Sequence, residues 1–481
     1  MKKTFAAKSW LVFCLIAIIE MFSFFGYYFP QFNEAAFFII IAVVIVAACE
    51  DLALGVGVLL AELFLGSKGY LFHLDVCGFQ ISWRIALWAV VMAIWAFKAI
   101  KRRLQDQEEL VTADQHDFLK PYLLLLFFVI IGAVNGLVRG HSLNNWFLDL
   151  NGWIYFTLIF PLYEIFIKKD KAINWQRLKV LFYAAMYFLC LKTILVFLLL
   201  KYGQGDFALD IYRWVRTSGV GEVTITDTEF YRTFFQSQIF IIAVLIIDFF
   251  SYISAIAQKK ISLARLSRYY FNFILFTGVI LISLSRSFWF GLGLAMLTAL
   301  VLILIREGKK IFWHSTSFIV ISTLAAIGLV ALLAWTAPQD FLMRTNINKN
   351  EPAVASRWAL LAKIGEEIKE APILGQGFGA TITYLSKDPR VNGEYTTYAF
   401  EWGWLDVWLK LGLLGLLTYL FIFVQNIYAG LKSKDYMANA VAITLLALGL
   451  VNIFSPYVNH PLGIGLLLLG ALAIVTKQKI R

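Results

Sequence analysis

Three arginines and one glutamate have the types and positions needed to bind a diphosphate and take a proton from a hydroxyl group. Arg232 and Arg286 stand beside or between apolar stretches, Arg357 lies within the longest polar segment, and Glu401 closes that segment. A guanidinium binds phosphate oxygens through a planar fork of N–H donors. A nearby carboxylate can act as general base on an attacking hydroxyl group. These residue types suit glycosyl transfer from a polyprenyl diphosphate, with arginines stabilising the leaving group.

Each of these residues also has a structural interpretation. Arg286 lies in a serine-rich turn between two apolar runs, where it either faces a wet cavity or an anion, or extends to the membrane surface. Arg232 begins an apolar run and has the same two interpretations. Glu401 either acts as the base or forms an ion pair with Arg357 or Arg390 that holds the polar segment.

Composition excludes an ordinary soluble protein, because 60% of residues are apolar, 16% are aromatic and the mean hydropathy is +0.75. Apolar runs of near membrane-spanning length recur along the chain, and they do not alternate with the period of two expected of a barrel. The sequence predicts one all-α, polytopic membrane domain over residues 1–481, with about 14 transmembrane helices (12–14). The predicted spans are 9–29, 33–49, 52–70, 80–100, 119–138, 150–167, 178–200, 233–256, 269–284, 288–305, 315–336, 402–428, 436–454 and 461–476.

The net charge of +11 has a membrane explanation rather than a nucleic-acid one. Lysines and arginines cluster at the ends of the spans, and all clusters fall on one side if both termini are cytoplasmic, which is the positive-inside pattern. Residues 201–232 then form a smaller outer loop, and residues 337–401 form a large outer loop. Connecting segments of this size carry function more often than packed spans do. The four cysteines show no metal-ligand spacing.

The large outer loop contains a predicted amphipathic helix at Ser356–Ala371, with Ser356 as its N-cap and Pro372 ending it. This helix either lies along the outer membrane interface, caps a cavity, or packs inside the loop. Its apolar stripe is expected to consist of Trp358, Leu361, Ile364 and Ile368.

Four further charged residues fall within predicted spans, where charge is costly unless it is paired or functional. Each is expected either to have a partner inside the bundle or to belong to a site. They are Glu20, Glu62, Lys192 and Asp248.

Three stretches in order carry a family resemblance. They are Tyr231-Arg232-Thr233-Phe234-Phe235; Ser283-Leu284-Ser285-Arg286-Ser287 followed by Gly291; and Ser356-Arg357-Trp358, leading through Ala371-Pro372-Ile373-Leu374-Gly375-Gln376-Gly377 to Leu411-Gly412-Leu413-Leu414-Gly415. In this order the chain resembles the O-antigen ligase and O-antigen polymerase superfamily of bacterial envelope proteins. The resemblance covers about Glu229 to Leu420.

The resemblance implies a glycan transferase at the outer face of the bacterial cytoplasmic (inner) membrane. It implies a glycan on undecaprenyl diphosphate as donor, bound by Arg232, Arg286 and Arg357, and no metal or other cofactor. The acceptor is a second lipid-linked glycan in a polymerase, and a lipid or a protein in a ligase. No nucleic acid is expected as partner.

One position departs from the family pattern. Family ligases carry a histidine eleven residues before the first glycine of the span that follows the large loop, and in this chain that position, counted from Gly412, is Glu401. Glu401 either replaces the histidine as base, or Asp406 or Glu394 acts instead. A polymerase tolerates this departure more easily, because polymerases of this kind vary more.

Two other classes of membrane protein would also use charged residues in a multispan bundle. An exporter or flippase of lipid-linked glycans should line its interior with charge through both leaflets and needs no large outer loop. A glycosyltransferase of the dolichol-mannosyl type places an acidic pair in its first outer loop, and the segment near Pro30 and Gln31 has none.

Overall fold

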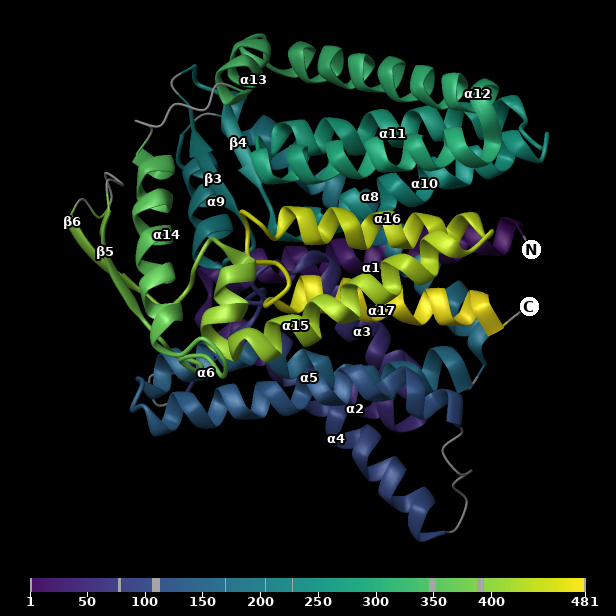
Figure 1. The fold of residues 1–481 in the computed structure, drawn as a ribbon. Coiled ribbons are helices and arrows are strands. Elements are labelled where there is room, and N and C mark those ends of the chain that lie inside the picture. The colour runs from purple at the N-terminus through teal and green to yellow at the C-terminus, as the bar shows by residue number, and fades with distance from the viewer. Residues whose placement is uncertain are drawn as a thin grey trace.

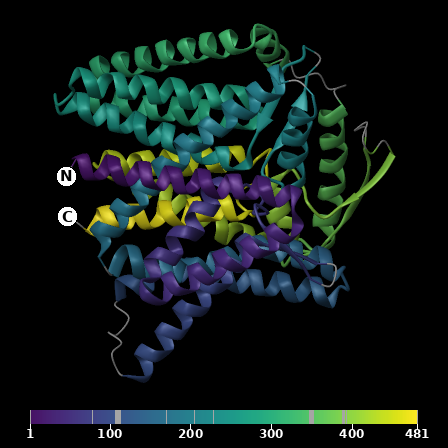
Figure 2. The ribbon, with the colours of Figure 1, turned by 180° about the vertical axis from the view of Figure 1, so that it is seen from behind.

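The computed structural model describes residues 2–76, 79–105, 113–168, 170–203, 205–226, 228–345, 352–386, 391 and 393–479. The protein is 79% helical, which confirms the all-α class. Most helices run along a common axis, and both termini lie at the same end of the bundle (Figure 1; Figure 2). We call this end the terminal end.

The helices differ widely in length, from single turns to the 48 residues of α12. The α-helices are α1 (Lys2–Tyr28), α2 (Pro30–Glu50), α3 (Leu52–Leu65), α4 (Trp83–Leu104), α5 (Ala113–Val138), α6 (Leu143–Trp153), α7 (Ile159–Tyr163), α8 (Lys171–Tyr202), α9 (Asp206–Thr217), α10 (Ile239–Ala257), α11 (Leu263–Ile282), α12 (Arg286–Leu333), α13 (Ala337–Thr345), α14 (Pro352–Glu370), α15 (Gly403–Lys432), α16 (Tyr436–Val451) and α17 (Pro461–Lys479). Three short helices of other types are η1 (Ile154–Leu158), η2 (Glu164–Lys168) and η3 (Gln236–Gln238).

Within the described residues, nine helical segments are long and apolar enough to cross a membrane, and three shorter apolar helices accompany them. The protein is therefore a polytopic helical membrane protein. The predicted spans fall on helical segments of the bundle. The span 150–167 runs through α6, η1, α7 and η2, and the spans 288–305 and 315–336 both fall on α12, the second of them ending beyond Leu333. The total of fourteen spans stays a prediction, because the shorter helices do not meet the length of a full crossing.

Among the described residues, three antiparallel hairpins that the sequence did not predict interrupt the helices. They are β1 (His73–Val76) with β2 (Phe79–Ser82), β3 (Glu222–Ile225) with β4 (Tyr231–Phe234), and β5 (Ile382–Ser386) with β6 (Gly393–Thr397). The second and third hairpins lie with α9, α13 and α14 at the end of the bundle opposite the termini (Figure 1; Figure 2). We call this the cap end. The two predicted outer loops therefore meet at one end of the molecule.

Two glycines with positive φ break long helices. Gly308 (φ 81°) divides α12 into two arms, and Gly412 (φ 70°) divides α15 after its first nine residues. The break at Gly412 would leave backbone groups unpaired, which is expensive inside a membrane unless other protein groups replace the lost partners.

The segment Pro372–Gly379 fills the break in α15. The N–H of Leu413 donates to the Pro372 carbonyl (2.9 Å), and the N–H of Gln376 donates to the Leu409 carbonyl (2.6 Å). On its other side the segment reaches α5, where the N–H of Phe378 donates to the Gly132 carbonyl (3.0 Å). The two glycine motifs of the family resemblance therefore meet in space and satisfy each other's backbone.

The amphipathic helix of the large loop forms as α14 and lies across the end of the bundle (Figure 1). It begins at Pro352, a favoured first residue, so the prediction of Ser356 as N-cap was wrong. The predicted apolar stripe was also partly wrong, because Trp358 is 56% exposed. The buried face instead consists of Ser356, Leu360, Ile364 and Ile368, spaced four residues apart.

The charged residues within predicted spans all have partners inside the bundle. Lys192 donates to Glu20 (2.7 Å). Arg84 makes two hydrogen bonds to Glu62, of 2.7 and 3.0 Å. Asp248 accepts hydrogen bonds from Tyr183 and Asn272, both 2.6 Å long. These ion pairs and hydrogen bonds lower the cost of burying the charges.

Candidate functional site

Arg357 and Glu401 form an ion pair at the cap end. Arg357 lies in the second turn of α14, and Glu401 lies two residues before α15 begins. The guanidinium Nε donates to the Oε2 atom of Glu401, and the side chains are 40% and 50% exposed. Arg390, the alternative partner, lies outside the described residues. The pair leaves the carboxylate accessible and holds it in one orientation, which suits a base as well as it suits a loop anchor.

Arg232 contacts the turn that carries Arg286. Arg232 lies on β4, opposite Thr224 of β3, and its Nε donates to the Ser283 carbonyl (2.9 Å). Leu284 takes a positive φ of 45° in this turn, and Arg286 is the first residue of α12. Both arginines are half-buried. The structure thus places two of the three predicted arginines at one turn of the cap end, Arg232 in contact with it and Arg286 directly after it.

The segment between α16 and α17 joins the turn of Arg286 to the Arg357–Glu401 pair. The Ser287 hydroxyl lies 2.9 Å from the Ser455 hydroxyl. Four aromatic rings continue from there, with centroids 5.6 Å apart for Phe290–Phe454, 5.6 Å for Phe454–Trp402 and 5.8 Å for Trp402–Trp358. The Trp402 indole N–H also donates to the Arg357 carbonyl (3.0 Å). We call this series the aromatic run.

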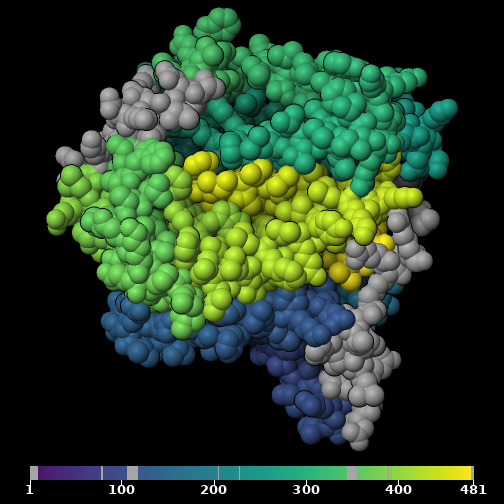
Figure 3. Space-filling view, in the orientation of Figure 1, coloured from purple at the N-terminus to yellow at the C-terminus, as the bar shows by residue number. Residues whose placement is uncertain are grey.

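The surface is hollowed beside α14, between the green helices α11 and α12 and the yellow segment that includes α16 (Figure 3). The elements that carry Arg286 and Arg357 therefore border a depression at the cap end. That all three arginines line this one cavity stays a prediction.

Sequence reasoning missed a buried cluster close to these residues. Lys410 lies 2.5 Å from an Asp149 oxygen and 2.8 Å from an Asp406 oxygen, and all three side chains are at most 8% exposed. Asp406 and Lys410 are four residues apart in the part of α15 before its break, and Asp149 comes from α6. Opposite charges four residues apart on an apolar helix are the sequence signal for this pair.

The two alternative bases differ in their surroundings. Asp406 is 1% exposed, bound to Lys410 and also hydrogen-bonded by the Asn459 amide, so its oxygens are already engaged. Glu394 lies on β6 opposite Leu385 and is exposed. Neither residue is in contact with an arginine of the predicted site among the contacts of the described residues.

Two groups near the cluster have pKa values shifted by burial. Burial, reinforced by the Asp149 carboxylate, raises the pKa of the Tyr398 hydroxyl. Burial lowers the pKa of His460 well below its usual value, and the positive charges of Arg84 and Lys68 lower it further. His460 is therefore neutral in the fold, and its Nδ1 accepts a hydrogen bond from the Leu462 N–H (3.3 Å) at the start of α17.

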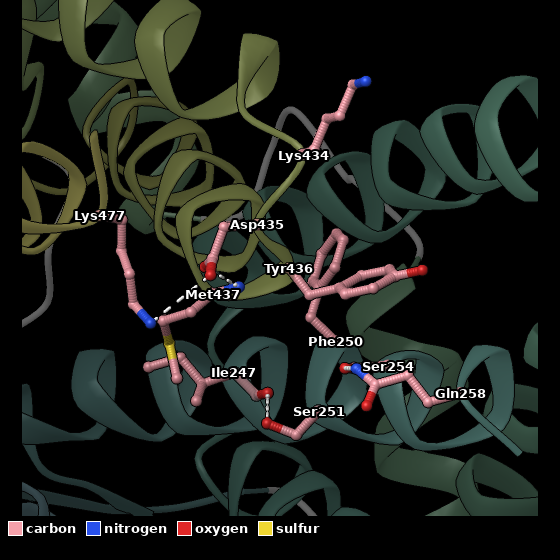
Figure 4. A pocket seen from close by; sticks show the side chains of 10 residues that line it. All are labelled: Ile247, Phe250, Ser251, Ser254, Gln258, Lys434, Asp435, Tyr436, Met437 and Lys477. Carbon is pink, nitrogen blue, oxygen red and sulfur yellow. Dashed lines mark hydrogen bonds and ion pairs between the residues drawn. The ribbon is translucent and has the colours of Figure 1, made fainter. Parts of the chain in front are cut away.

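A separate cavity of about 560 Å³ opens at the terminal end. Its walls come from α10, from the connection between α15 and α16, and from the end of α17 (Figure 4). Lys477 lies 3.5 Å from Asp435 at its rim. This cavity shares none of the four predicted site residues. The described residues also contain no group of three or more metal-ligating side chains.

Residues 271–420 match the model of the O-antigen ligase family. This segment is similar to the O-antigen ligase family. It contains Arg286, Arg357 and Glu401, together with the two glycine motifs that meet at the break in α15. Arg232 precedes the O-antigen ligase segment but contacts it at Ser283. The resemblance to the superfamily is thus confirmed, and it supports a membrane glycan transferase of the O-antigen ligase type. No curated protein matches the chain.

Proposed function

We propose that this protein transfers a glycan from undecaprenyl diphosphate to an acceptor hydroxyl group at the outer face of the bacterial cytoplasmic membrane. The observation that carries the proposal is the Arg357–Glu401 ion pair, which lies in the O-antigen ligase segment and is joined through the aromatic run to the helix that Arg286 begins. The cap end, with residues 201–232 and 337–401, is then the outer end of the molecule, and both termini are cytoplasmic.

The diphosphate of the donor is held by Arg232 and Arg286. Arg286 starts α12, so the positive end of the helix dipole adds to its charge at the place where a phosphate would lie. Arg232 is fixed against the same turn by its bond to the Ser283 carbonyl. Two guanidinium groups can neutralise the charge that grows on the leaving diphosphate without any metal ion.

Glu401 acts as the general base. The acceptor hydroxyl oxygen attacks the anomeric carbon of the donor sugar, the bond from that carbon to the diphosphate oxygen breaks, and its electron pair stays on the diphosphate. The proton of the hydroxyl group passes to Glu401 Oε1, since Oε2 is held by Arg357. Arg357 thereby orients the base and contributes charge to the diphosphate site.

A polymerase, with a second lipid-linked glycan as acceptor, fits the replacement of the ligase histidine by Glu401 better than a ligase does. The alternative is a flippase or exporter of the same lipid-linked glycan. The buried charges of the bundle give that alternative little support, because Lys192, Arg84 and Asp248 are each bound to neighbours within the bundle. An exporter would move the donor across the vesicle membrane without forming a glycosidic bond.

The test compares E401Q with E394Q in vesicles that contain the purified protein and a lipid-linked oligosaccharide donor. E401Q keeps the size and most hydrogen bonding of the side chain but removes the base, so transfer should fall about a hundred- to ten-thousandfold. Binding of undecaprenyl diphosphate should persist in E401Q and be lost in R286A. E394Q is the matched control, because Glu394 is an exposed carboxylate on β6, and this variant should transfer normally. Normal transfer by E401Q would remove Glu401 as base.

A further inference from the structure

We propose that the buried cluster of Asp149, Lys410 and Asp406 is the positioning device of the transferase site, setting the place of Glu401 relative to the Arg286 turn. This inference rests on the proposed function, because it assigns Glu401 as the group that is positioned. We call these three residues the buried cluster.

Lys410 holds the segment that leads to Glu401. Its ammonium group donates to the Tyr398 carbonyl (3.0 Å) and lies 5.2 Å from the centre of the Phe400 ring. Phe400 is 1% exposed and packs with α14 residues in a common core, so the chain immediately before Glu401 is fixed on two sides. A buried lysine in the first part of α15 thus reaches the backbone that carries the base.

The two carboxylates hold the other segments of the site. Asp149 Oδ2 accepts the Gly379 N–H (2.8 Å), which fixes the segment that fills the break in α15. Asp406 accepts a hydrogen bond from the Asn459 side-chain amide. Asn459 belongs to the same connection as Ser455, whose hydroxyl lies beside that of Ser287 next to Arg286.

The three side chains of the buried cluster therefore contact three different parts of the site. They reach the chain before Glu401, the glycine segment after α14, and the connection that contacts the Arg286 turn. Stability alone does not explain such a cluster, because apolar residues of similar volume often stabilise a protein as well as a buried ion pair does. A buried charge network instead fixes geometry, and misplacing a reacting group by about 1 Å can cost roughly a hundredfold in rate.

The experiment measures kcat, donor KM and the pH dependence of kcat for K410M and D149N, on protein that is monodisperse in detergent. We expect kcat to fall about a hundredfold with donor KM nearly unchanged, because the donor site is retained while the base is displaced. The limb of the pH profile that reports the base should shift, and K410R should recover part of kcat. If K410M does not accumulate as folded protein, the same measurements on D149N test the proposal.

Two comparisons separate positioning from simple loss of stability. D248N is the matched control, since Asp248 is equally buried and hydrogen-bonded by two partners, but on α10 away from the cap segments. It should lose stability and keep kcat. In the E401Q background, K410M should cause no further loss of kcat, because groups that act as a unit are not additive.

The outcomes distinguish this inference from the proposed function. Full kcat in folded K410M and D149N, beside an inactive E401Q, would overturn the positioning role and leave the proposed base intact. The positioning role would also be overturned if K410M lowered kcat by the same factor in the E401Q background as in the wild-type protein. Full transfer by E401Q would overturn the assignment of the base and the positioning role together.

Discussion

Replacing Gly412 by alanine should disrupt the meeting of the two glycine motifs. Gly412 has φ 70° and ψ −179°, a region of backbone conformation that is essentially confined to glycine. An added Cβ would overlap the Ile373 carbonyl and lie 2.6 Å from the Gly375 nitrogen, and both of these are backbone atoms that cannot rotate away.

The magnitude follows from strain and from lost hydrogen bonds. Holding alanine in this conformation costs on the order of 1–3 kcal/mol. Moving the Pro372–Gly379 segment aside weakens its bonds to Leu413 and Leu409, each worth about 1 kcal/mol, and leaves buried backbone groups unpaired. We expect G412A to lower the free energy of unfolding by about 3–5 kcal/mol.

The assay is thermal unfolding of the purified protein in detergent, followed by intrinsic tryptophan fluorescence. G293A is the control, because Gly293 lies inside α12 with no atom within 4 Å of an added Cβ. It should unfold at or above the wild-type temperature, since alanine is the better helix former. A G412A protein as stable as G293A would show that the break in α15 does not depend on the glycine segment, and would refute the reasoning.

Two further predictions concern pH and topology. Because burial and nearby cations lower the pKa of His460, the folded protein stays unprotonated there while the unfolded chain takes up a proton below about pH 6.5. The contribution of His460 to the free energy of unfolding should therefore be fully present above that pH and fall by up to about 1.4 kcal/mol per pH unit below it. In unfolding measured from pH 8 to 5, H460Q should show a smaller dependence on pH than the wild type. Equal dependence in the two proteins would contradict the predicted direction of the pKa shift. For topology, a single cysteine at Glu394 should react with an impermeant reagent in intact cells, and one at Lys434 only after permeabilisation; the reverse order would place the cap end inside.

The sequence by itself determined the class of protein and supplied the residues of the proposed site. Apolar runs of spanning length can only satisfy their backbone groups as helices in lipid, so composition and period decide a polytopic helical bundle. Arg286 stood out because charge beside apolar runs is costly unless it is used. Arg357 and Glu401 stood out through their places in the large polar segment and in the family pattern. Their order along the chain was enough to indicate the family.

Tertiary structure decided which residues meet, because those contacts join segments far apart in the sequence. Asp149 and Lys410 are separated by 261 positions, and no local pattern links them. The exposed face of α14 was misjudged for a related reason. Its periodicity allowed either face to be apolar, and only packing against β5 and the start of α15 selected Leu360 over Trp358. The break at Gly412 likewise depends on a segment that starts forty residues earlier, at Pro372, whose carbonyl replaces a lost helical partner.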